Sequence, residues 1–270
     1  MGYFMKKVLV LLLAAGVIVS SSFCKAKNKS GKEVVRIAIE GGWKPYNFVD
    51  ENGKITGFDV DVVNAIAERI PDITLKIEPT PWDGMLVALA AGRFDVAANE
   101  IKKNAAREKQ FLYASNPYNY DYPALIFKNS TVIKSAEDLF GKTVIVGGGS
   151  SYAEWVENFN KETGGKINIV YAGDTATAAV FAEVLSGRAD VTIDSPVAAG
   201  IFINERKEPL SYIPADPNLL NPAYLIYTKN KKGERIKVLF DKGLEEIRAD
   251  GTLSKLAVKW FGSDTTVKSK

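Results

Sequence analysis

The sequence predicts an α/β fold of two similar lobes, because one phrase occurs in it twice. Residues 92–99, GRFDVAAN, return 95 positions later as GRADVTID at residues 187–194. Each copy follows an Ala/Leu-rich stretch, so its glycine marks the end of a helix and the next residues form a short buried strand. Open α/β sheets bind ligands outside the carboxyl ends of their strands. The polar residues at these ends, Asn99 and Asp194, therefore predict two walls of one cleft, with chance recurrence of a helix–glycine–strand unit as the alternative.

Residues 1–30 have the features of an export leader followed by a polar tether. Two lysines precede twelve apolar residues, 8–19, a run too short to span a bilayer and suited to a secretory signal. Cleavage directly before Cys24, the only cysteine, would produce a lipid-anchored protein. Cleavage after Ala26 by the ordinary signal peptidase is the alternative. Both predict an exported protein, either periplasmic or anchored to the outer face of a bacterial membrane.

Composition excludes several classes of function. The chain contains no histidine and one cysteine, which excludes a zinc or copper site and histidine-based acid–base catalysis. Residues 1–30 carry five lysines and no acid, and the remainder balances 30 basic against 32 acidic residues. No basic patch interleaved with aromatic residues remains, so no nucleic-acid partner is expected. We expect a monomer with no cofactor and no metal.

Residues 34–122 follow the alternation of strands and helices that covers a sheet with helices. The loop at 40–46 carries Trp43 and Tyr46, aromatic side chains that a loop does not need for folding. Asp59 is a candidate N-cap for the helix that follows. The expected elements are a strand at 34–39, a helix at 59–70, a strand at 74–77, and a helix from Trp82 to Gly92.

Residues 123–228 repeat this alternation and are expected to form the second lobe. A Gly147–Gly149 loop enters a helix with Ser151 and Glu154 at capping-box spacing. Such a helix start suits an anion, and a flexible loop with an ordinary cap is the alternative. Prolines beside two strands mark crossings between lobes, so the first lobe is expected at 34–122 plus 229–264. The expected elements are strands at 124–127, 143–146, 167–171, 191–193 and 224–228, helices at 136–141, 152–161 and 174–186, and two helices within 237–262.

Nine short motifs occur in a fixed order over residues 34–262. They are WKPYNF at 43–48, GFDVD at 57–61, WDG at 82–84, GRFD at 92–95, REK at 107–109, NPY at 116–118, GSSY at 149–152, DSPV at 194–197 and RADGT at 248–252. Together they resemble the bacterial extracytoplasmic amino-acid-binding proteins of ABC importers, the family 3 solute-binding proteins. The resemblance implies the two-lobed type II periplasmic-binding-protein fold, with mixed sheets, flanking helices and a two-strand hinge.

The resemblance also implies which residues contact a ligand. In this family an arginine after the first lobe's cleft strand holds the ligand α-carboxylate, and Arg107 stands there. Its guanidinium can donate two parallel N–H bonds to a carboxylate, and a surface charge is the alternative. The resemblance implies that Asp194 binds the ligand α-ammonium. The implied contacts are Glu40, Trp43, Tyr46, Trp82, Asn99, Glu100, Lys102, Arg107, Ser150, Ser151 and Asp194.

Three of these residues depart from the common pattern or bear on ligand choice. Lys102 stands where many relatives carry a small hydroxyl residue, and it could reinforce carboxylate binding or point outward. Glu40 stands where relatives that bind basic amino acids often carry aspartate. Glu40 and Glu100 together would leave surplus negative charge in the site, which favours a ligand with a cationic side chain or the second ammonium of cystine. The alternative is that both acids are solvated charges at the rim of the cleft. The segment 98–113 most resembles the cystine-binding branch.

The resemblance therefore implies a binding component that captures a polar L-amino acid between two lobes and delivers it to a membrane permease. Cystine and basic amino acids are the candidate ligands, and no catalysis is expected. A periplasmic dehydratase of prephenate or arogenate on the same fold is the alternative. Such an enzyme needs an acid poised to protonate a leaving hydroxyl, which Glu40, Glu100 or Asp194 could supply.

Overall fold

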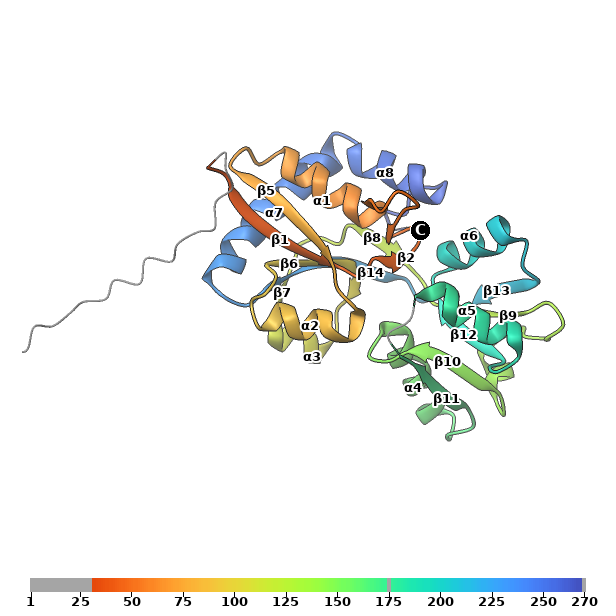
Figure 1. The fold of residues 1–270 in the computed structure, drawn as a ribbon. Helices are drawn as coiled ribbons and strands as arrows, with labels where there is room; N and C mark the ends of the chain where they lie inside the picture. The colour runs from red at the N-terminus through yellow and green to blue at the C-terminus, as the bar shows by residue number, and fades with distance from the viewer. Residues whose placement is uncertain (1–30, 174–175, 269–270) are drawn as a thin grey trace, which may run out of the picture.

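Two separate sheets divide the chain into two lobes (Figure 1). The computed structural model describes residues 31–173 and 176–268, so the expected leader and Cys24 lie outside the described ranges. The strands of the larger sheet are β1 (Glu33–Ile39), β5 (Ile73–Pro79), β6 (Val96–Lys102), β7 (Phe111–Tyr113), β8 (Asn119–Asp121) and β14 (Asn221–Thr228). Their order is β5-β1-β6-β14-β7, with β8 paired to β14. β1 runs parallel to β5 and β6, and β14 runs antiparallel to its neighbours.

Helices pack on both faces of the larger sheet, because its side chains point alternately to one face and to the other. Ile37 and Ile39 of β1 pack into the core beneath α1 (Phe58–Glu68), α7 (Lys231–Ala249) and α8 (Thr252–Phe261). Ala38, between them, faces the opposite core, where α2 (Trp82–Ala90) contributes Met85 and Leu89. This period of two residues is the pattern of a strand covered on both faces. The short α3 (Ala105–Gln110) follows β6.

The smaller sheet forms the second lobe in the same way. Its strands are β9 (Ala124–Lys128), β10 (Thr143–Gly147), β11 (Asn168–Ala172), β12 (Val191–Asp194) and β13 (Leu210–Pro214), in the order β11-β10-β12-β9-β13. The helical elements are η1 (Ala136–Leu139), α4 (Ser151–Glu162), α5 (Thr177–Ser186) and α6 (Pro196–Arg206). Val156 of α4 packs on one face of the sheet and Phe181 of α5 on the other. The predicted α/β fold with two sheets is confirmed.

Both copies of the repeated phrase form the predicted helix end and strand. The second strand ends at Asp194 as predicted, whereas the first continues past Asn99 to Lys102. Gly92 and Gly187 have φ of 71° and 79°, the left-handed region in which a glycine ends a helix. The strands that follow them, β6 and β12, lie near the middle of their sheets. Asn99 and Asp194 thus come from equivalent places in the two lobes.

A small three-stranded sheet fixes the aromatic loop after β1. Its strands are β2 (Gly42–Trp43), β3 (Asn47–Val49) and β4 (Ile55–Thr56). Gly57 then starts α1 with φ of 125°, and a Cβ there would collide with the Tyr46 carbonyl. The expectation that Asp59 caps this helix is wrong. Asp59 lies inside the helix and is fully buried, and its carboxylate accepts bonds from Asn47 and Tyr118.

The chain passes from β8 to β9 and returns between β13 and β14. β14 pairs with β6, β7 and β8 of the first sheet, with Ile226 opposite Ala97. The return crossing therefore lies before residue 221, whereas the expected boundary placed residues 221–228 in the second lobe. The other lobe boundaries remain predictions.

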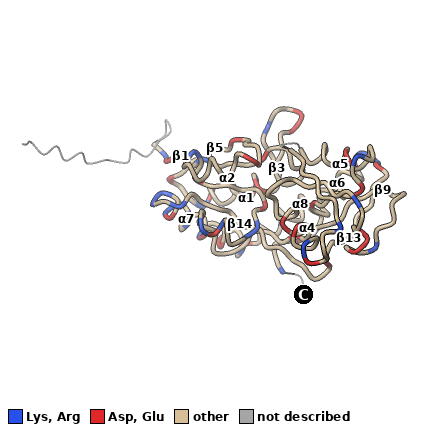
Figure 2. Tube along the Cα trace, turned by 90° about the horizontal axis from the view of Figure 1, so that it is seen from below, with Lys and Arg blue, Asp and Glu red and all other residues tan. Residues whose placement is uncertain are grey.

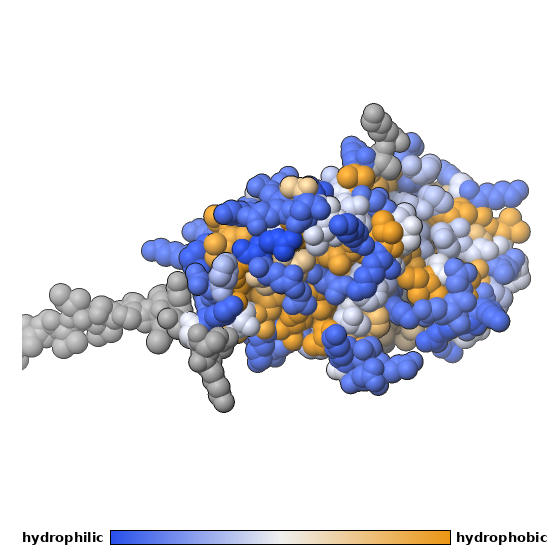
Figure 3. Space-filling view, turned by 90° about the horizontal axis from the view of Figure 1, so that it is seen from above, coloured by the Kyte–Doolittle hydropathy of each residue, from blue (hydrophilic) through white to orange (hydrophobic). Residues whose placement is uncertain are grey.

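The surface mixes both signs of charge. Basic and acidic residues alternate over both lobes in Figure 2, in keeping with their near balance after residue 30. In Figure 3 hydrophilic side chains cover most of the visible face, with apolar patches between them. Within residues 31–173 and 176–268, no helix has the length and apolar character needed to cross a membrane.

Candidate ligand-binding site

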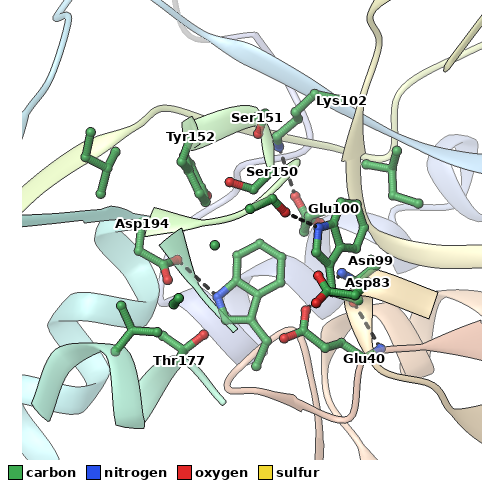
Figure 4. Close-up of a pocket in the computed structure, with 18 of the residues that line it drawn as sticks. Glu40, Asp83, Asn99, Glu100, Lys102, Ser150, Ser151, Tyr152, Thr177 and Asp194 are labelled. Carbon is green, nitrogen blue, oxygen red and sulfur yellow. Dashed lines mark hydrogen bonds and ion pairs between the residues drawn. The ribbon is translucent and has the colours of Figure 1, made fainter. Parts of the chain in front are cut away.

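A cavity lies between the lobes, where the carboxyl ends of β1 and β6 face those of β10 and β12. A volume of about 100 Å³ is accessible there to the centre of a water-sized sphere, and part of the cavity is open to solvent. Figure 4 shows Asp194 on one side and Glu40, Asp83 and Asn99 on another, with Lys102 and Ser151 beyond them. Ten of the eleven predicted contacts line it: Glu40, Trp43, Trp82, Asn99, Glu100, Lys102, Arg107, Ser150, Ser151 and Asp194.

Asn99 joins β6 to Glu40, which directly follows β1, and to Asn47 of β3. Its Oδ1 accepts from the Glu40 N–H at 3.1 Å and from Asn47 Nδ2 at 2.8 Å, and its Nδ2 donates to Glu40 Oε2 at 3.2 Å. A bulge lies beside it, where residues 98–100 of β6 face Leu225 alone. The bulge interrupts the regular ladder between β6 and β14 at the cavity wall, which is a usual place for one.

Asp194 is the acid on the opposite wall. Its Oδ1 accepts from the Ser195 N–H at 2.6 Å and from Trp43 Nε1 at 3.2 Å. Burial raises the pKa of Asp194 to about 7. The negative charges of Glu40 and Asp121 also raise this pKa, whereas the two hydrogen bonds lower it. A buried carboxylate of this kind gains most from a cationic partner.

Arg107 and the start of α4 form a positive end of the cavity. Asn104 caps α3 by accepting from the Arg107 N–H at 2.8 Å. The guanidinium is then directed inward, where Nη1 donates to Lys102 O at 3.1 Å and Nη2 to Gly149 O at 2.6 Å. With 7% of its surface exposed, Arg107 is not a surface charge, and burial lowers its pKa.

The glycine-rich loop enters α4 one residue earlier than the capping-box spacing suggested. Ser150, not Ser151, is the N-cap, and its Oγ accepts from the Ala153 N–H at 3.0 Å. Glu154 is therefore free of a capping role and accepts from Asn104 of the other lobe at 3.0 Å. Ser151 becomes the first helical residue, and the first amides of a helix lack partners within it.

Tyr46 is the one predicted contact that does not line the cavity. It is fully buried behind Trp43, with ring centroids 4.5 Å apart. Its hydroxyl donates to Asp121 at 3.2 Å and is hydrogen-bonded to Ser195 Oγ at 2.7 Å. Tyr46 thus supports the wall and connects the lobes, because a tyrosine hydroxyl that is buried needs polar partners.

A layer of buried acids and tyrosines lies beneath the cavity. It contains Asp59, Glu100 and Asp121, and burial raises the pKa of all three carboxyl groups. Tyr118 donates to Asp59 at 2.6 Å, and Tyr152 donates to Asp121 at 3.4 Å. Glu100 is 3% exposed, so it is not a solvated rim charge.

Several lining residues had no place among the predicted contacts. They include Asp83, Tyr152 and Thr177. Each stands in the first turn of a helix, α2, α4 or α5. The position of Tyr152 directly after Ser151 was a usable signal, since both belong to the helix start that faces the cleft. Asp83 and Thr177 carry no comparable signal in the sequence.

Direct contacts join the lobes around the cavity, so the structure is a closed form. Trp82 Nε1 donates to Gly148 O at 3.2 Å, and Lys44 Nζ pairs with Glu205 at 2.7 Å. The bonds of Trp43 to Asp194 and of Arg107 to Gly149 also cross the cleft. Within the described ranges, no cluster of acidic and cysteine side chains is suited to a metal ion. The arrangement suits a small molecule with a negative group at one end and a positive group at the other.

Comparisons with known proteins agree with this geometry. The profile of the bacterial extracellular solute-binding proteins, family 3, matches residues 35–263. The L-cystine-binding protein TcyJ of Bacillus subtilis is 32% identical over 271 residues, covering 98% of each chain. The probable amino-acid-binding protein YxeM of the same organism is 33% identical, covering 98% of this chain and 99% of its own.

Solved structures show the same architecture. A putative L-cystine ABC transporter protein from Listeria monocytogenes matches with a TM-score of 0.78 at 32% identity, covering 88% of this chain and 99% of that one. A chain studied for glutathione import via GshT in Streptococcus mutans matches with a TM-score of 0.81, over 88% of this chain and 98% of that one. At 22% identity, the second likeness concerns the fold alone. The predicted two-lobed fold is confirmed over both sheets.

Proposed function

We propose that this chain, which belongs to the bacterial extracellular solute-binding proteins of family 3, captures an L-amino acid between its lobes for delivery to the permease of an ABC importer. One observation carries the proposal. Arg107 and Asp194, two side chains of opposite charge, line one cavity from different lobes. The carboxylate of a zwitterion can pair with Arg107 and its ammonium with Asp194, and contact with both requires the lobes to be closed.

The ligand α-carboxylate binds at the positive end. Arg107 donates two N–H bonds in a planar fork that matches a carboxylate. Arg107 Nη2 donates to Gly149 O at 2.6 Å, and the carboxylate takes the place of this main-chain acceptor. The Ser151 N–H at the first turn of α4 is a further donor, and the helix dipole favours the negative charge.

The ligand α-ammonium binds at Asp194. Trp43 Nε1 and the Ser195 N–H already hold this carboxylate in position on Oδ1. The ammonium adds the positive charge that the buried acid lacks. Main-chain groups of residues 99 and 100, at the bulge of β6, complete this end of the site.

Ligand binding favours closure because its two ends contact different lobes. The hinge consists of the two crossings beside β8 and β14, and the wall bonds from Tyr46 to Asp121 and Ser195 span it. A ligand shifts a hinge equilibrium only by its differential affinity for the two states. A ligand that contacts both Arg107 and Asp194 binds the closed state more tightly, because only that state offers both contacts.

The ligand side chain lies toward Trp43, Trp82, Glu40 and Asp83. Indole rings beside carboxylates accommodate a polar or cationic chain. The curated relatives named above include an L-cystine-binding protein. We propose a polar amino acid, with cystine and the basic amino acids as the candidates.

We further propose that the protein acts outside the cytoplasmic membrane, as the family does, and has no catalytic role. Anchoring through Cys24 and release after Ala26 remain alternatives. The named relatives are amino-acid-binding and ABC-transport proteins, so the dehydratase alternative is unsupported.

Chemically blocked ligands test this proposal without any substitution. Calorimetry with L-arginine, L-lysine, L-glutamine and L-cystine identifies a binder, and the same amino acid is then titrated as its amide and as its N-acetyl derivative. Both derivatives are expected to lose at least 100-fold in affinity, because each leaves a buried charge unpaired, at about 3 kcal/mol or more. Retention of binding by the amide would contradict the role of Arg107, and retention by the N-acetyl form would contradict that of Asp194.

A further inference from the structure

Lys102 and Glu100 form a buried ion pair at the end of β6. The Lys102 Nζ lies 3.4 Å from Glu100 Oε2, a long contact, while the side chains are 8% and 0% exposed. Glu100 has φ of 49°, unusual for a residue other than glycine. Backbone strain of this kind collects at functional sites. Here it occurs at a residue that lines the cavity.

Burial and the charge of Asp121 disfavour the charged form of Glu100, and Lys102 and Asn119 are the groups that support it. Its Oε2 also accepts from Asn119 Nδ2 at 2.9 Å, but among the described residues Oε1 has no hydrogen-bond partner. Lys102 is the cation whose charge lowers the pKa of all three buried carboxyl groups. The titratable groups that face Glu100 are Asp59 of α1, Tyr46 of the aromatic loop, Lys102 of β6, Tyr118 and Asp121 at β8, and Tyr152 of α4.

The other side of Lys102 faces the cavity. It lines the cavity together with Arg107 and Ser151. Figure 4 shows its ammonium between Ser151 and Glu100. An ammonium has three donors, so it can exchange one acceptor for another without a change in the backbone.

We propose that Lys102 is a second cationic ligand for the bound carboxylate, and that its transfer from Glu100 to that carboxylate makes Glu100 take up a proton from solvent. This inference rests on the proposed function, because it requires a carboxylate at the Arg107 end. The resting pair keeps Lys102 charged and positioned while the cleft is empty. Glu100 is thus a positioning residue, and Lys102 determines the preference for a carboxylate.

The surroundings of Glu100 explain why it takes up a proton when Lys102 leaves it. When Lys102 turns to the ligand, Glu100 is left in a fully buried layer with Asp59 and Asp121. Burial and like charges both favour the neutral acid. The orphan Oε1 is the atom available to carry the proton. Glu100 therefore contributes one proton taken up on binding, and this contribution weakens binding as pH rises.

Calorimetry in two buffers of different ionisation enthalpy tests the proposal, with L-arginine and L-cystine as probes. The wild type, Glu100→Gln and Lys102→Met are compared, with Glu108→Gln on the exposed part of α3 as the matched control. The difference in proton uptake between the wild type and Glu100→Gln isolates Glu100, because contributions from Asp194 and the probe cancel. Thermal unfolding of each variant verifies that it folds.

We expect the wild type to take up about one proton more than Glu100→Gln per molecule bound, by linkage. Lys102→Met is expected to weaken binding about tenfold to 100-fold, the loss of one charge-assisted bond. Glu100→Gln is expected to bind more tightly, since Lys102 no longer has a competing partner. Equal proton uptake in the two proteins, or unchanged affinity in Lys102→Met, would overturn the inference. If the amide of the probe still fails to bind in that case, the proposed function stands and only the role of Lys102 is wrong.

Discussion

Replacing Arg107 with lysine is the substitution whose effect the structure defines most sharply. Lysine keeps the positive charge but cannot donate two parallel N–H bonds. Arg107 is 7% exposed, so the ligand carboxylate it meets has lost most of its water. Losing one charge-assisted bond there costs about 1.5–3 kcal/mol, or about tenfold to 150-fold in Kd. Arg107→Ala removes both guanidinium bonds to the carboxylate and is expected to cost about 3–5 kcal/mol.

The assay is isothermal titration with the tightest amino acid of the panel, and Arg93→Lys is the control. Arg93 lies in the same lobe, is exposed and is absent from the cavity lining. Its replacement is expected to leave Kd within twofold, because surface substitutions usually cost little. If Arg107→Lys also bound within twofold of the wild type, the carboxylate would not meet the guanidinium, and the assignment of the positive end would be refuted.

Three other substitutions test the site and its support. Burial raises the pKa of Asp194 to about 7, above its unfolded value, so this group's contribution to stability is present below pH 4 and is lost as pH rises to 7. Asp194→Asn should therefore raise the unfolding midpoint of ligand-free protein more at pH 8 than at pH 5, and an equal change at both would contradict the shift. Tyr46→Phe removes the bonds to Asp121 and Ser195 and should weaken binding roughly fivefold, about 1 kcal/mol, mainly through faster release in stopped-flow experiments. Gly57→Ala should lower the midpoint by about 4–12 °C through a cost of about 2–3 kcal/mol, whereas Gly53→Ala, with positive φ but open space, should cost less.

The position of the cleft could be predicted from the sequence, because each wall of the cleft is formed by a short continuous segment of the chain. The repeated phrase contains its own helix end, its buried strand and its terminal polar residue, and each of these depends on neighbours in the chain. Gly92 and Gly187 accordingly take the expected left-handed conformation, and Asn99 and Asp194 line one cavity. The resemblance added Arg107, whose position no local pattern indicates.

The layer beneath the cavity could not be predicted in this way. Asp59 has the position and chemistry of a helix cap, but Asn47 and Tyr118 supply partners that make its burial possible. Tyr46 has the character of a ligand contact, yet its hydroxyl satisfies Asp121 from 75 residues away. Such bonds depend on tertiary contacts between elements, and no spacing in the sequence reports them.

Thermal unfolding of ligand-stripped protein against the twenty amino acids, cystine, ornithine and prephenate tests the central claim most directly. A ligand at 1,000 times its Kd stabilises the folded state by about 4 kcal/mol, which raises the midpoint by about 8–16 °C in a chain of this size. The account predicts such a rise with one group of L-amino acids and its loss in Arg107→Ala. No rise with any amino acid, or a rise with prephenate alone, would contradict it.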